Sequence, residues 1–470
     1  MLDHITRPYE IPYGIMIPEK IDGVIVPVAA STTHVAYSSI RMEPTWMTLG
    51  QAAGTAADLA IRNRVAPRAV PIAELQEALI QQGQVLRHQE NLHAPPMLSG
   101  TWVPEDSRLI DFTKLPHIPA EHSVVSDVRP AGNDPTKVDK SQGGVNQHNY
   151  LIFHQNQFWI MWSDGPGVED RVGQRVRFAT SPDGLTWSKP EFLTPEPLGS
   201  GPDSEFYGKR TAKGSRWIAR GFWKRGEDLL ALASLDEAAE FFGPGLTLRA
   251  FRLDESSSEW QDQGVVFENS INNFPPELLP DGQWMMSRRT YDYKKTGVHF
   301  LIGGLESINA WKSFPVLGSS SELAAEEPLW WVLPDNRLLA LFRDNRRSGF
   351  LYRSFSLDNG RTWSSPEPTN FPDATSKLHG LRLRDGRFVL VSNANPAKRD
   401  PLTIAVSNDG VTFSQMGYLV GERHVDYPHV MEHDGSLFVA FAGGKQTVEV
   451  LRICIDDMNR TLNDAQSVPR

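Results

Sequence analysis

Apolar residues in this sequence gather in short runs that recur along the chain at intervals of roughly 50 residues. Each run follows a two-residue turn motif, which is the pattern of a β-hairpin. A periodic series of short hairpins predicts a repeat architecture in which each hairpin belongs to one small sheet. Examples of the runs are Phe158–Trp162, Trp284–Ser287, Leu338–Phe342 and Phe388–Val391.

The number of hairpin turns predicts the number of sheets. Six turns indicate six blades, so we expect an all-β fold, a six-bladed β-propeller with a small α/β N-terminal segment. The sequence after the fifth blade is too short for a complete sixth blade. We therefore expect residues 122–128, which precede the first blade, to supply the missing strand and close the ring. The turns are Gln155-Asn156, Lys213-Gly214, Asp281-Gly282, Asp335-Asn336, Asp385-Gly386 and Asp434-Gly435.

A second motif, Ser-x-Asp-(x)-Gly-x-Thr followed by Trp or Phe, also repeats. In such a turn the Asp and Ser or Thr side chains bind backbone amides, the glycine takes a positive φ, and the aromatic ring packs between blades. These Asp boxes resemble the repeats of sialidases and related propellers. Degenerate copies are expected over Asp254–Trp260 and Glu306–Trp311. The full copies run from Ser181 to Trp187, from Ser356 to Trp363 and from Ser407 to Phe413.

The first residues follow a different pattern, with a predicted strand over Gly23–Ala29 and a helix rich in small residues from Pro44 to Ile61. With its Gly50–Ala57 stretch, this segment resembles the C-terminal end of the flavin domain of FAD-dependent oxidoreductases. No Gly-x-Gly-x-x-Gly motif lies between a strand and a helix. We therefore expect no cofactor and interpret the segment as a retained fusion fragment or docking element; a metal ion in the axial channel stays open.

An amphipathic pattern over residues 72–90 predicts a further helix, with Leu75, Leu79 and Val85 on its apolar side. The Pro95-Pro96 pair that follows predicts a domain boundary. The expected organisation is therefore a flavin-oxidoreductase-like fragment over residues 1–95 and a propeller over residues 96–470.

Charge and composition narrow the classes of partner. The net charge is −10, which disfavours nucleic acid and anionic membranes as partners. The single cysteine, Cys454, excludes an intramolecular disulfide and a thiolate zinc cage. No apolar stretch approaches the roughly 20 residues of a membrane helix. Without an apolar leader after Met1, a cytoplasmic location is the default expectation, and a secreted form stays open.

Candidate site residues follow from propeller geometry, because the positions at which inner strands begin converge on one face. The position nine residues before the second residue of each inner turn is polar in every blade. The alternative to a functional role is that loop residues at the start of a strand are commonly polar. These positions are Gln147, Glu205, Asn273, Glu327, Lys377 and Asp426, and their polar neighbours are His148, Asp203, Glu277, His379, Tyr427 and His429.

Arginines add to this ring. Arg289 and Arg343 follow inner strands at the same offset, and Arg220 lies two residues earlier in its blade. Arg288 is the alternative candidate to Arg289. A guanidinium near the axis matches a carboxylate ligand. The resemblance to sialidases implies that three arginines hold the substrate carboxylate, while a tyrosine activated by a glutamate acts as nucleophile and an aspartate as acid/base.

Carried onto this chain, the resemblance implies Tyr427 as nucleophile, paired with Glu327 or Glu277, and Glu205 is a further catalytic carboxylate. The chain departs from sialidases in lacking a clear Phe/Tyr-Arg-Ile-Pro element before the first blade. The Gln147-His148-Asn149 stretch also resembles propeller enzymes acting on rhamnosyl-glucuronate linkages, which include lyases.

Three functions stay open on these residues. The leading hypothesis is a carbohydrate-active enzyme, a sialidase-like glycoside hydrolase that cleaves a glycosidic bond next to an acidic sugar. The second is a polysaccharide lyase, in which His148 or Tyr427 removes the C5 proton of a uronate. The third is a propeller that binds glycans without catalysis, because a fold alone does not determine function.

Overall fold

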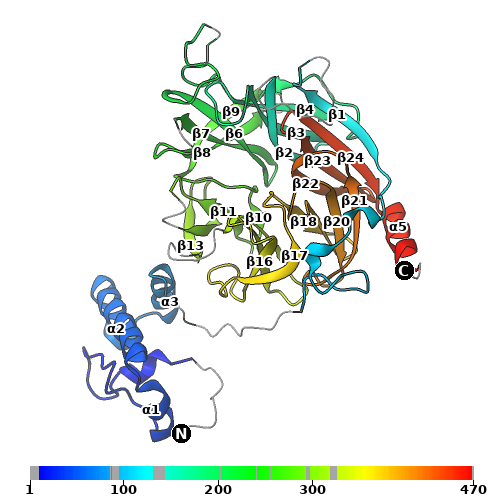
Figure 1. Cartoon of the computed structure of the whole chain (residues 1–470). Coiled ribbons are helices and arrows are strands. Elements are labelled where there is room, and N and C mark those ends of the chain that lie inside the picture. Colours follow the sequence, from blue (N-terminus) through cyan, green and yellow to red (C-terminus); the bar gives the residue numbers. More distant parts are fainter. Residues whose placement is uncertain are drawn as a thin grey trace. The chain divides into compact units, whose positions relative to one another are not determined.

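A computed structural model describes residues 10–84, 86, 95–130, 143–201, 203–239, 241–254, 256–257, 259–292, 297–317 and 325–467. The chain divides into two compact units, one made mainly of residues 1–92 and one of residues 93–470 without Ser313–Pro315 (Figure 1). The first contains the described helices α1 to α3, and the second contains the described strands apart from Ser313–Pro315 of β13.

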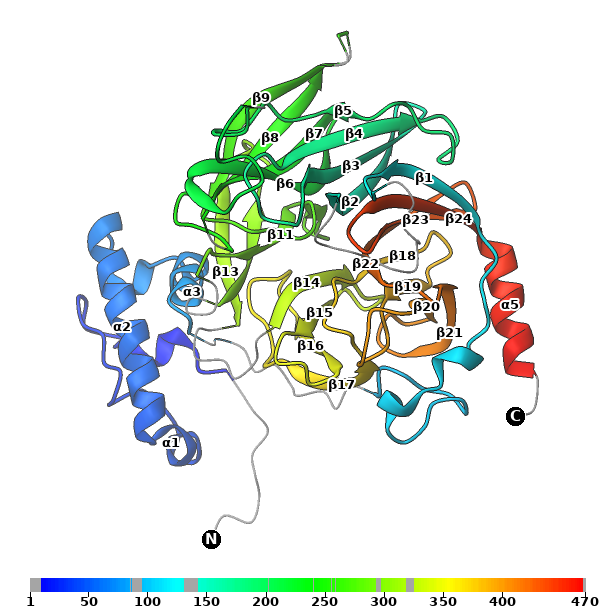
Figure 2. The ribbon, with the colours of Figure 1, turned by 45° about the horizontal axis from the view of Figure 1, so that its top comes forward.

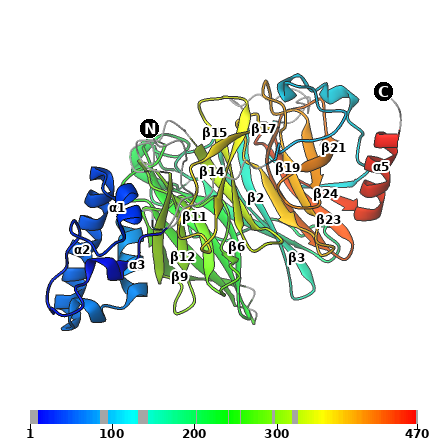
Figure 3. The ribbon, with the colours of Figure 1, turned by 90° about the horizontal axis from the view of Figure 1, so that it is seen from below.

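The helical unit is organised around α2, whose small and apolar residues recur every three or four positions and form a buried stripe. The stripe, which includes Leu49, Ala56 and Leu59, forms a core with Leu75 and Leu79 of α3. Figure 3 shows α2 and α3 side by side. The elements are η1 (Tyr13–Met16), α1 (His34–Ile40), α2 (Glu43–Asn63), η2 (Pro67–Ala69) and α3 (Ile72–Gln81).

Two local predictions for this unit need correction. The expected strand over Gly23–Ala29 is wrong, because these residues form bends. Pro27 lacks the amide hydrogen that a sheet requires, and Val26 instead donates its N–H to the Met16 carbonyl at 2.8 Å. The helix expected over residues 72–90 ends at Gln81. Val85 lies outside the described residues.

The second unit contains six four-stranded sheets, which confirms the predicted six-bladed propeller. Figure 2 shows the sheets around a common axis, with the inner strands β2, β6, β14, β18 and β22 nearest to it. The first three blades contain β2 (Gly144–His154), β3 (Gln157–Pro166), β4 (Arg175–Ser181) and β5 (Glu191–Phe192); β6 (Thr211–Arg225), β7 (Asp228–Ala238), β8 (Thr247–Asp254) and β9 (Glu259–Glu268); and β10 (Glu277–Leu278), β11 (Trp284–Arg289), β12 (Val298–Gly303) and β13 (Trp311–Leu317).

The ring is closed by β1 (Glu121–Asp127), which pairs antiparallel with the last strand of the chain. This confirms the expected borrowing of residues 122–128, and it covers an edge that would otherwise expose unpaired backbone groups. The helix α5 (Ile455–Ser467) follows and packs on β24 and β21. The last blades contain β14 (Ala325–Val332), β15 (Leu338–Asp344), β16 (Phe350–Ser356) and β17 (Glu367–Pro372); β18 (His379–Arg382), β19 (Phe388–Ser392), β20 (Leu402–Ser407) and β21 (Phe413–Val420); and β22 (Val425–His433), β23 (Ser436–Gly443) and β24 (Thr447–Cys454) with β1.

Five of the six predicted inner turns are confirmed by the strand boundaries, and one is wrong. Lys213-Gly214 lies inside β6, which extends over 15 residues and turns only at Gly226-Glu227. The register of β6 shifts between Thr211 and Ser215. A Lys-Gly pair at such an irregularity has the local sequence of a hairpin turn, so the pattern placed the turn of this blade too early.

The Asp boxes connect the third and fourth strands of their blades and hold these turns through side-chain hydrogen bonds. The Asp183 carboxylate accepts the Leu185 and Thr186 amides at 2.9 and 2.7 Å, and the Ser181 hydroxyl accepts the Gly184 amide at 2.8 Å. These amides hold the pKa of Asp183 well below its usual value. The aromatic residue after each turn packs on the preceding blade, as in the pairs Trp260–Trp159, Trp311–Trp223 and Trp363–Phe300.

Residues before the first strand also belong to the propeller core. Met97, Leu98 and Ile118 are buried against blades 4, 5 and 6. The Pro95 carbonyl accepts a hydrogen bond from Arg353 Nη1 at 2.8 Å. Two short 3-10 turns, η3 (Ser107–Leu109) and η4 (Phe112–Lys114), lie within this segment.

Deleting residues 1–92 should leave a propeller that unfolds cooperatively, because the segment from Pro95 onward and the ring closure stay intact. A longer deletion through Ile118 is the matched control, and it should abolish cooperative unfolding by removing five buried apolar side chains. Urea unfolding followed by tryptophan fluorescence measures both variants. Loss of the transition in the shorter deletion would show that the helical unit completes the propeller core.

Candidate functional site

Three inner strands contain a β-bulge at the same end of the propeller axis. The register of β2 shifts between Gln147 and Tyr150, that of β14 between Glu326 and Leu329, and that of β22 between Asp426 and His429. In each bulge one non-glycine residue has a positive φ: His148 at 56°, Glu327 at 54° and Tyr427 at 55°. Left-handed backbone is unfavourable for these side chains, and such strain and bulges concentrate at functional sites.

The structure buries five of the six polar residues predicted from the strand starts. Gln147, Asn273, Glu327, Lys377 and Asp426 are each at most 4% exposed. Glu205 is exposed in a turn before β6, because its position was counted from the misassigned Lys213-Gly214 turn.

Glu327 is the carboxylate on which several predicted residues converge. Arg343 Nη1 lies 2.8 Å from Glu327 Oε2, and Asn273 Nδ2 donates to Glu327 Oε1 at 3.0 Å. Arg289 Nη2 lies 3.7 Å from Oε1 and donates to Asn273 Oδ1 at 3.1 Å. Blades 3 and 4 are therefore joined through one buried carboxylate and two guanidinium groups.

Two further cations are buried without a carboxylate at salt-bridge distance among the described residues. Arg220 is 1% exposed, and its Nε donates to Ser234 Oγ at 2.9 Å. Burial lowers the pKa of Arg220 to about 10. Lys377 is fully buried and donates to Tyr150 Oη at 3.0 Å. Burial lowers its pKa to about 7, although the Glu327 charge acts in the opposite direction.

Tyr427 lies beside His148, with the two rings stacked at a centroid distance of 5.2 Å and an interplanar angle of 6°. Lys445 Nζ lies 5.0 Å from the centre of the Tyr427 ring, and Arg399 Cζ lies 5.5 Å from it. Burial, and then the charge of Arg220, lower the pKa of His148 well below its usual value. His148 is therefore a neutral imidazole at neutral pH.

The expected hydrogen bond between Tyr427 and Glu327 is not formed. In the described part of the chain no side chain hydrogen-bonds the Tyr427 hydroxyl, and Glu327 is held by Arg343 and Asn273. The charged groups beside the phenol are the two cations of Lys445 and Arg399.

Sequence patterns missed Arg399 and Lys445. Arg399 forms an ion pair with the fully buried Asp426, and Lys445 forms one with Glu169 at 2.6 Å. Both lie in connections between the second and third strands of their blades, whereas the predicted residues lie near the hairpins of the inner strands. A signal was present in blade 6, where Gly443-Gly444 before Lys445 indicates a tight turn at the axial end.

Three other candidates lie apart from these groups. Arg288 faces away, with its guanidinium 5.1 Å from the Phe267 ring of blade 2 and its Nε donating to the Asn269 carbonyl at 3.3 Å. Glu277 lies in β10, close to the inner turn of blade 3. Its side chain is exposed to solvent. Asp203 is exposed.

His379 and His429 connect neighbouring blades. The Val430 amide donates to His379 Nδ1 at 3.0 Å, and the Leu151 amide donates to His429 Nδ1 at 3.2 Å. The two rings stack at 4.2 Å. Burial lowers the pKa of His379 to about 3 and that of His429 well below its usual value. Each Nδ1 is thus an acceptor that protonation would remove.

Acid should destabilise the propeller through these histidines. Below a pH of about 6.5 the unfolded chain binds a proton at each histidine and the folded protein does not. The free energy of unfolding should therefore fall by up to about 1.4 kcal/mol per pH unit for each residue, down to a pH near 3 for His379. His379→Asn keeps an acceptor for Val430 and should show a shallower fall between pH 7 and 5 in urea unfolding. Equal slopes would contradict this role.

The described residues hold no group of three or more His, Cys, Asp or Glu side chains arranged for a metal ion. No described helix is long and apolar enough to cross a membrane.

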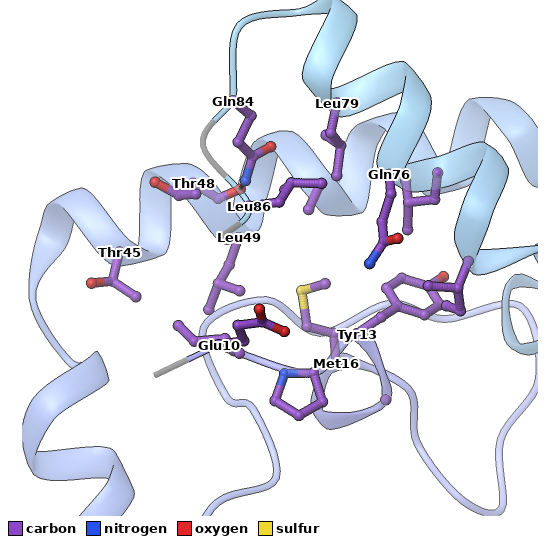
Figure 4. A pocket seen from close by; sticks show the side chains of 16 residues that line it. Glu10, Tyr13, Met16, Thr45, Thr48, Leu49, Gln76, Leu79, Gln84 and Leu86 are labelled. Atoms are coloured by element: carbon purple, nitrogen blue, oxygen red, sulfur yellow. Dashed lines mark hydrogen bonds between the residues drawn. The ribbon is translucent and has the colours of Figure 1, made fainter. Parts of the chain in front are cut away.

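The helical unit contains a cavity of about 570 Å³, lined mainly by apolar side chains. Figure 4 shows Met16, Leu49 and Leu79 around it. A flavin dinucleotide needs amides at a helix N-terminus for its pyrophosphate. The α2 helix instead begins with Glu43 and Pro44, an acidic side chain and a residue without an amide hydrogen. The residues present do not fit FAD.

Comparison with known families agrees with the two units. A family model described as a BNR repeat-like domain matches residues 221–439. A second model, described as FAD dependent oxidoreductase, matches residues 2–79, which confirms the resemblance of the helical unit. Among curated proteins none matches this chain.

Solved structures share the propeller fold at low sequence identity. A sialidase has 17% identity and a TM-score of 0.52; the match covers 76% of this chain and 35% of that one. The leech intramolecular trans-sialidase has 11% identity and a TM-score of 0.54, covering 72% and 71% of the two chains. The intramolecular trans-sialidase from Ruminococcus gnavus has 13% identity and a TM-score of 0.53, covering 71% and 98%. At these identities the likeness concerns the fold.

Proposed function

We propose that this protein is a glycoside hydrolase that cleaves the glycosidic bond of a carboxylate-bearing sugar. The observation that carries the proposal is a buried excess of positive charge at the axis. Arg220, Arg289, Arg343 and Lys377 are buried around the Glu327 carboxylate. A ligand carboxylate would complement this concentration of positive charge.

Tyr427 is the proposed nucleophile. It stands at a strained bulge, next to two cations and a neutral imidazole. A phenol is a weak nucleophile and needs activation by neighbouring groups. This arrangement supports activation by Lys445 and Arg399 instead of by a hydrogen-bonded glutamate. The relatives named sialidase and trans-sialidase lend support through the shared fold.

Elimination from a uronate is the second candidate, and the His148–Tyr427 stack favours it. A lyase needs a base to remove the C5 proton while cations neutralise the carboxylate. His148 is partly exposed and neutral at neutral pH, which suits proton removal.

One assay separates these functions. The full-length protein is incubated with chromogenic glycosides of sialic acid and of glucuronic acid, and with a rhamnosyl-glucuronate polysaccharide. Release of the chromophore without ultraviolet absorbance from an unsaturated sugar supports hydrolysis. New ultraviolet absorbance supports elimination. Binding of an acidic sugar without any product would leave a glycan-binding propeller and overturn the proposed activity.

A further inference from the structure

Arg220, Arg289, Arg343, Lys377 and Glu327, here called the axial cluster, have an unbalanced charge. When Lys377 is protonated, four cations lie around the Glu327 carboxylate, and each of the five residues is at most 8% exposed. Several kcal/mol is the usual penalty for each ion removed from water, and pairing offsets it only in part. Of the four cations, Lys377 is the one able to lose its charge near neutral pH, because guanidinium groups keep theirs.

The surroundings of Lys377 act on its charge in opposite directions. Its Nζ lies 4.1 Å from the Tyr150 ring centre and 4.8 Å from that of Phe274, and aromatic faces favour a cation. Burial and the charges of Arg220 and Arg343 oppose it. The balance favours a weakened ammonium, since burial lowers the pKa of Lys377 to about 7.

We propose that Lys377 couples proton uptake to anion binding: it is neutral in the free protein at mildly alkaline pH and takes up a proton from water when an acidic sugar binds. The location of the sugar carboxylate beside Arg289 and Arg343 rests on the proposed function. A carboxylate there adds negative charge beside the cluster, and it makes the Lys377 ammonium more favourable. Coupling of this kind is reciprocal, so protons also strengthen sugar binding.

Other titratable groups near the cluster have pKa values that differ from that of Lys377. Burial raises the pKa of Tyr150 above its usual value, and the pKa of His379 is about 3, so neither changes protonation near neutral pH. Asp373 is the second group that could exchange a proton when an anion binds. Its carboxyl faces Arg343 and Arg399, and burial raises its pKa to about 7. The remaining charged or titratable groups around the cluster are Asp170, Lys445, His148, His429 and Tyr427.

The free protein provides the first test, which needs no ligand. Between pH 7 and 9 the unfolded chain carries a proton on Lys377 and the folded protein loses it. The unfolding equilibrium constant of the parent, relative to Lys377→Met, should therefore fall by up to about tenfold per pH unit as the pH rises. Lys377→Gln is the second variant if the methionine protein does not fold. A ratio that stays constant with pH overturns the proposal.

Binding provides the second test. Calorimetric titration of the full-length protein with free sialic acid or glucuronic acid, in two buffers of different ionisation enthalpy, counts the protons exchanged. We expect almost none at pH 6, where Lys377 is already charged, and close to one taken up at about pH 8.5. Uptake should vanish in Lys377→Met and persist in Asp373→Asn.

The two tests separate the inference from the proposed function. Sugar binding without proton uptake overturns the coupling. Uptake that persists in Lys377→Met and vanishes in Asp373→Asn assigns the proton to Asp373 and overturns it as well. If neither acid binds while the free protein shows the expected pH dependence, the proposed function fails and the neutral Lys377 stands.

Discussion

Replacing Tyr427 with phenylalanine should lower the turnover number on an active glycoside by about 10³-fold or more, the scale seen when a catalytic nucleophile is removed. The substitution deletes one oxygen whose hydroxyl has no hydrogen-bond partner among the described residues, and it keeps the ring that stacks on His148. Stability should therefore change little. Steady-state kinetics and urea unfolding of the same preparation measure the two effects.

Tyr207→Phe is the matched control, because Tyr207 is 48% exposed and lies outside the axial groups. Its kinetics should equal those of the parent. His148→Ala decides between the mechanisms: it should abolish activity if the imidazole is the base of an elimination, and it should leave substantial hydrolysis if Tyr427 attacks the sugar. Full activity in both Tyr427→Phe and His148→Ala would place the reaction elsewhere.

Replacing Arg343 with methionine should weaken the interaction with an acidic substrate by about 2 to 5 kcal/mol, the cost of truncating one side of a buried charge pair. Methionine retains much of the aliphatic volume, and Glu327 keeps its contacts with Asn273 and Arg289. Most of the loss should thus appear in kcat/KM, measured beside the free energy of unfolding.

Arg288→Met is the control for the loss of a positive charge at a similar height in the propeller. Arg288 packs on Phe267 and faces away from Glu327, so its removal should leave kcat/KM unchanged. If Arg343→Met and Arg288→Met have equal kinetics on every acidic substrate, Arg343 does not contact the sugar.

The candidate site was predictable where it depends on repeat position. Gln147, Asn273, Glu327, Lys377 and Asp426 are buried as counting from the turns implied, because each inner strand starts at the same end of the axis. The prediction that Glu205 is buried near the axis was wrong, because the irregular strand β6 extends past the turn from which the position was counted. Arg399 and Lys445 were missed because long side chains reach the site from connections between the second and third strands of their blades.

Local sequence determined the blades, the Asp-box turns and the strand that closes the ring. These features depend on contacts between residues near in sequence, such as the Asp183 carboxylate and its own turn amides, or on a repeat that any segment reveals. The tertiary structure decided the charge states and partners of the site. Glu327 binds Arg343 of the neighbouring strand but not Tyr427, and Lys377 lies against Tyr150, which is 227 residues away in sequence. Burial and the summed field of several blades set these properties, and neither is encoded in one stretch of chain.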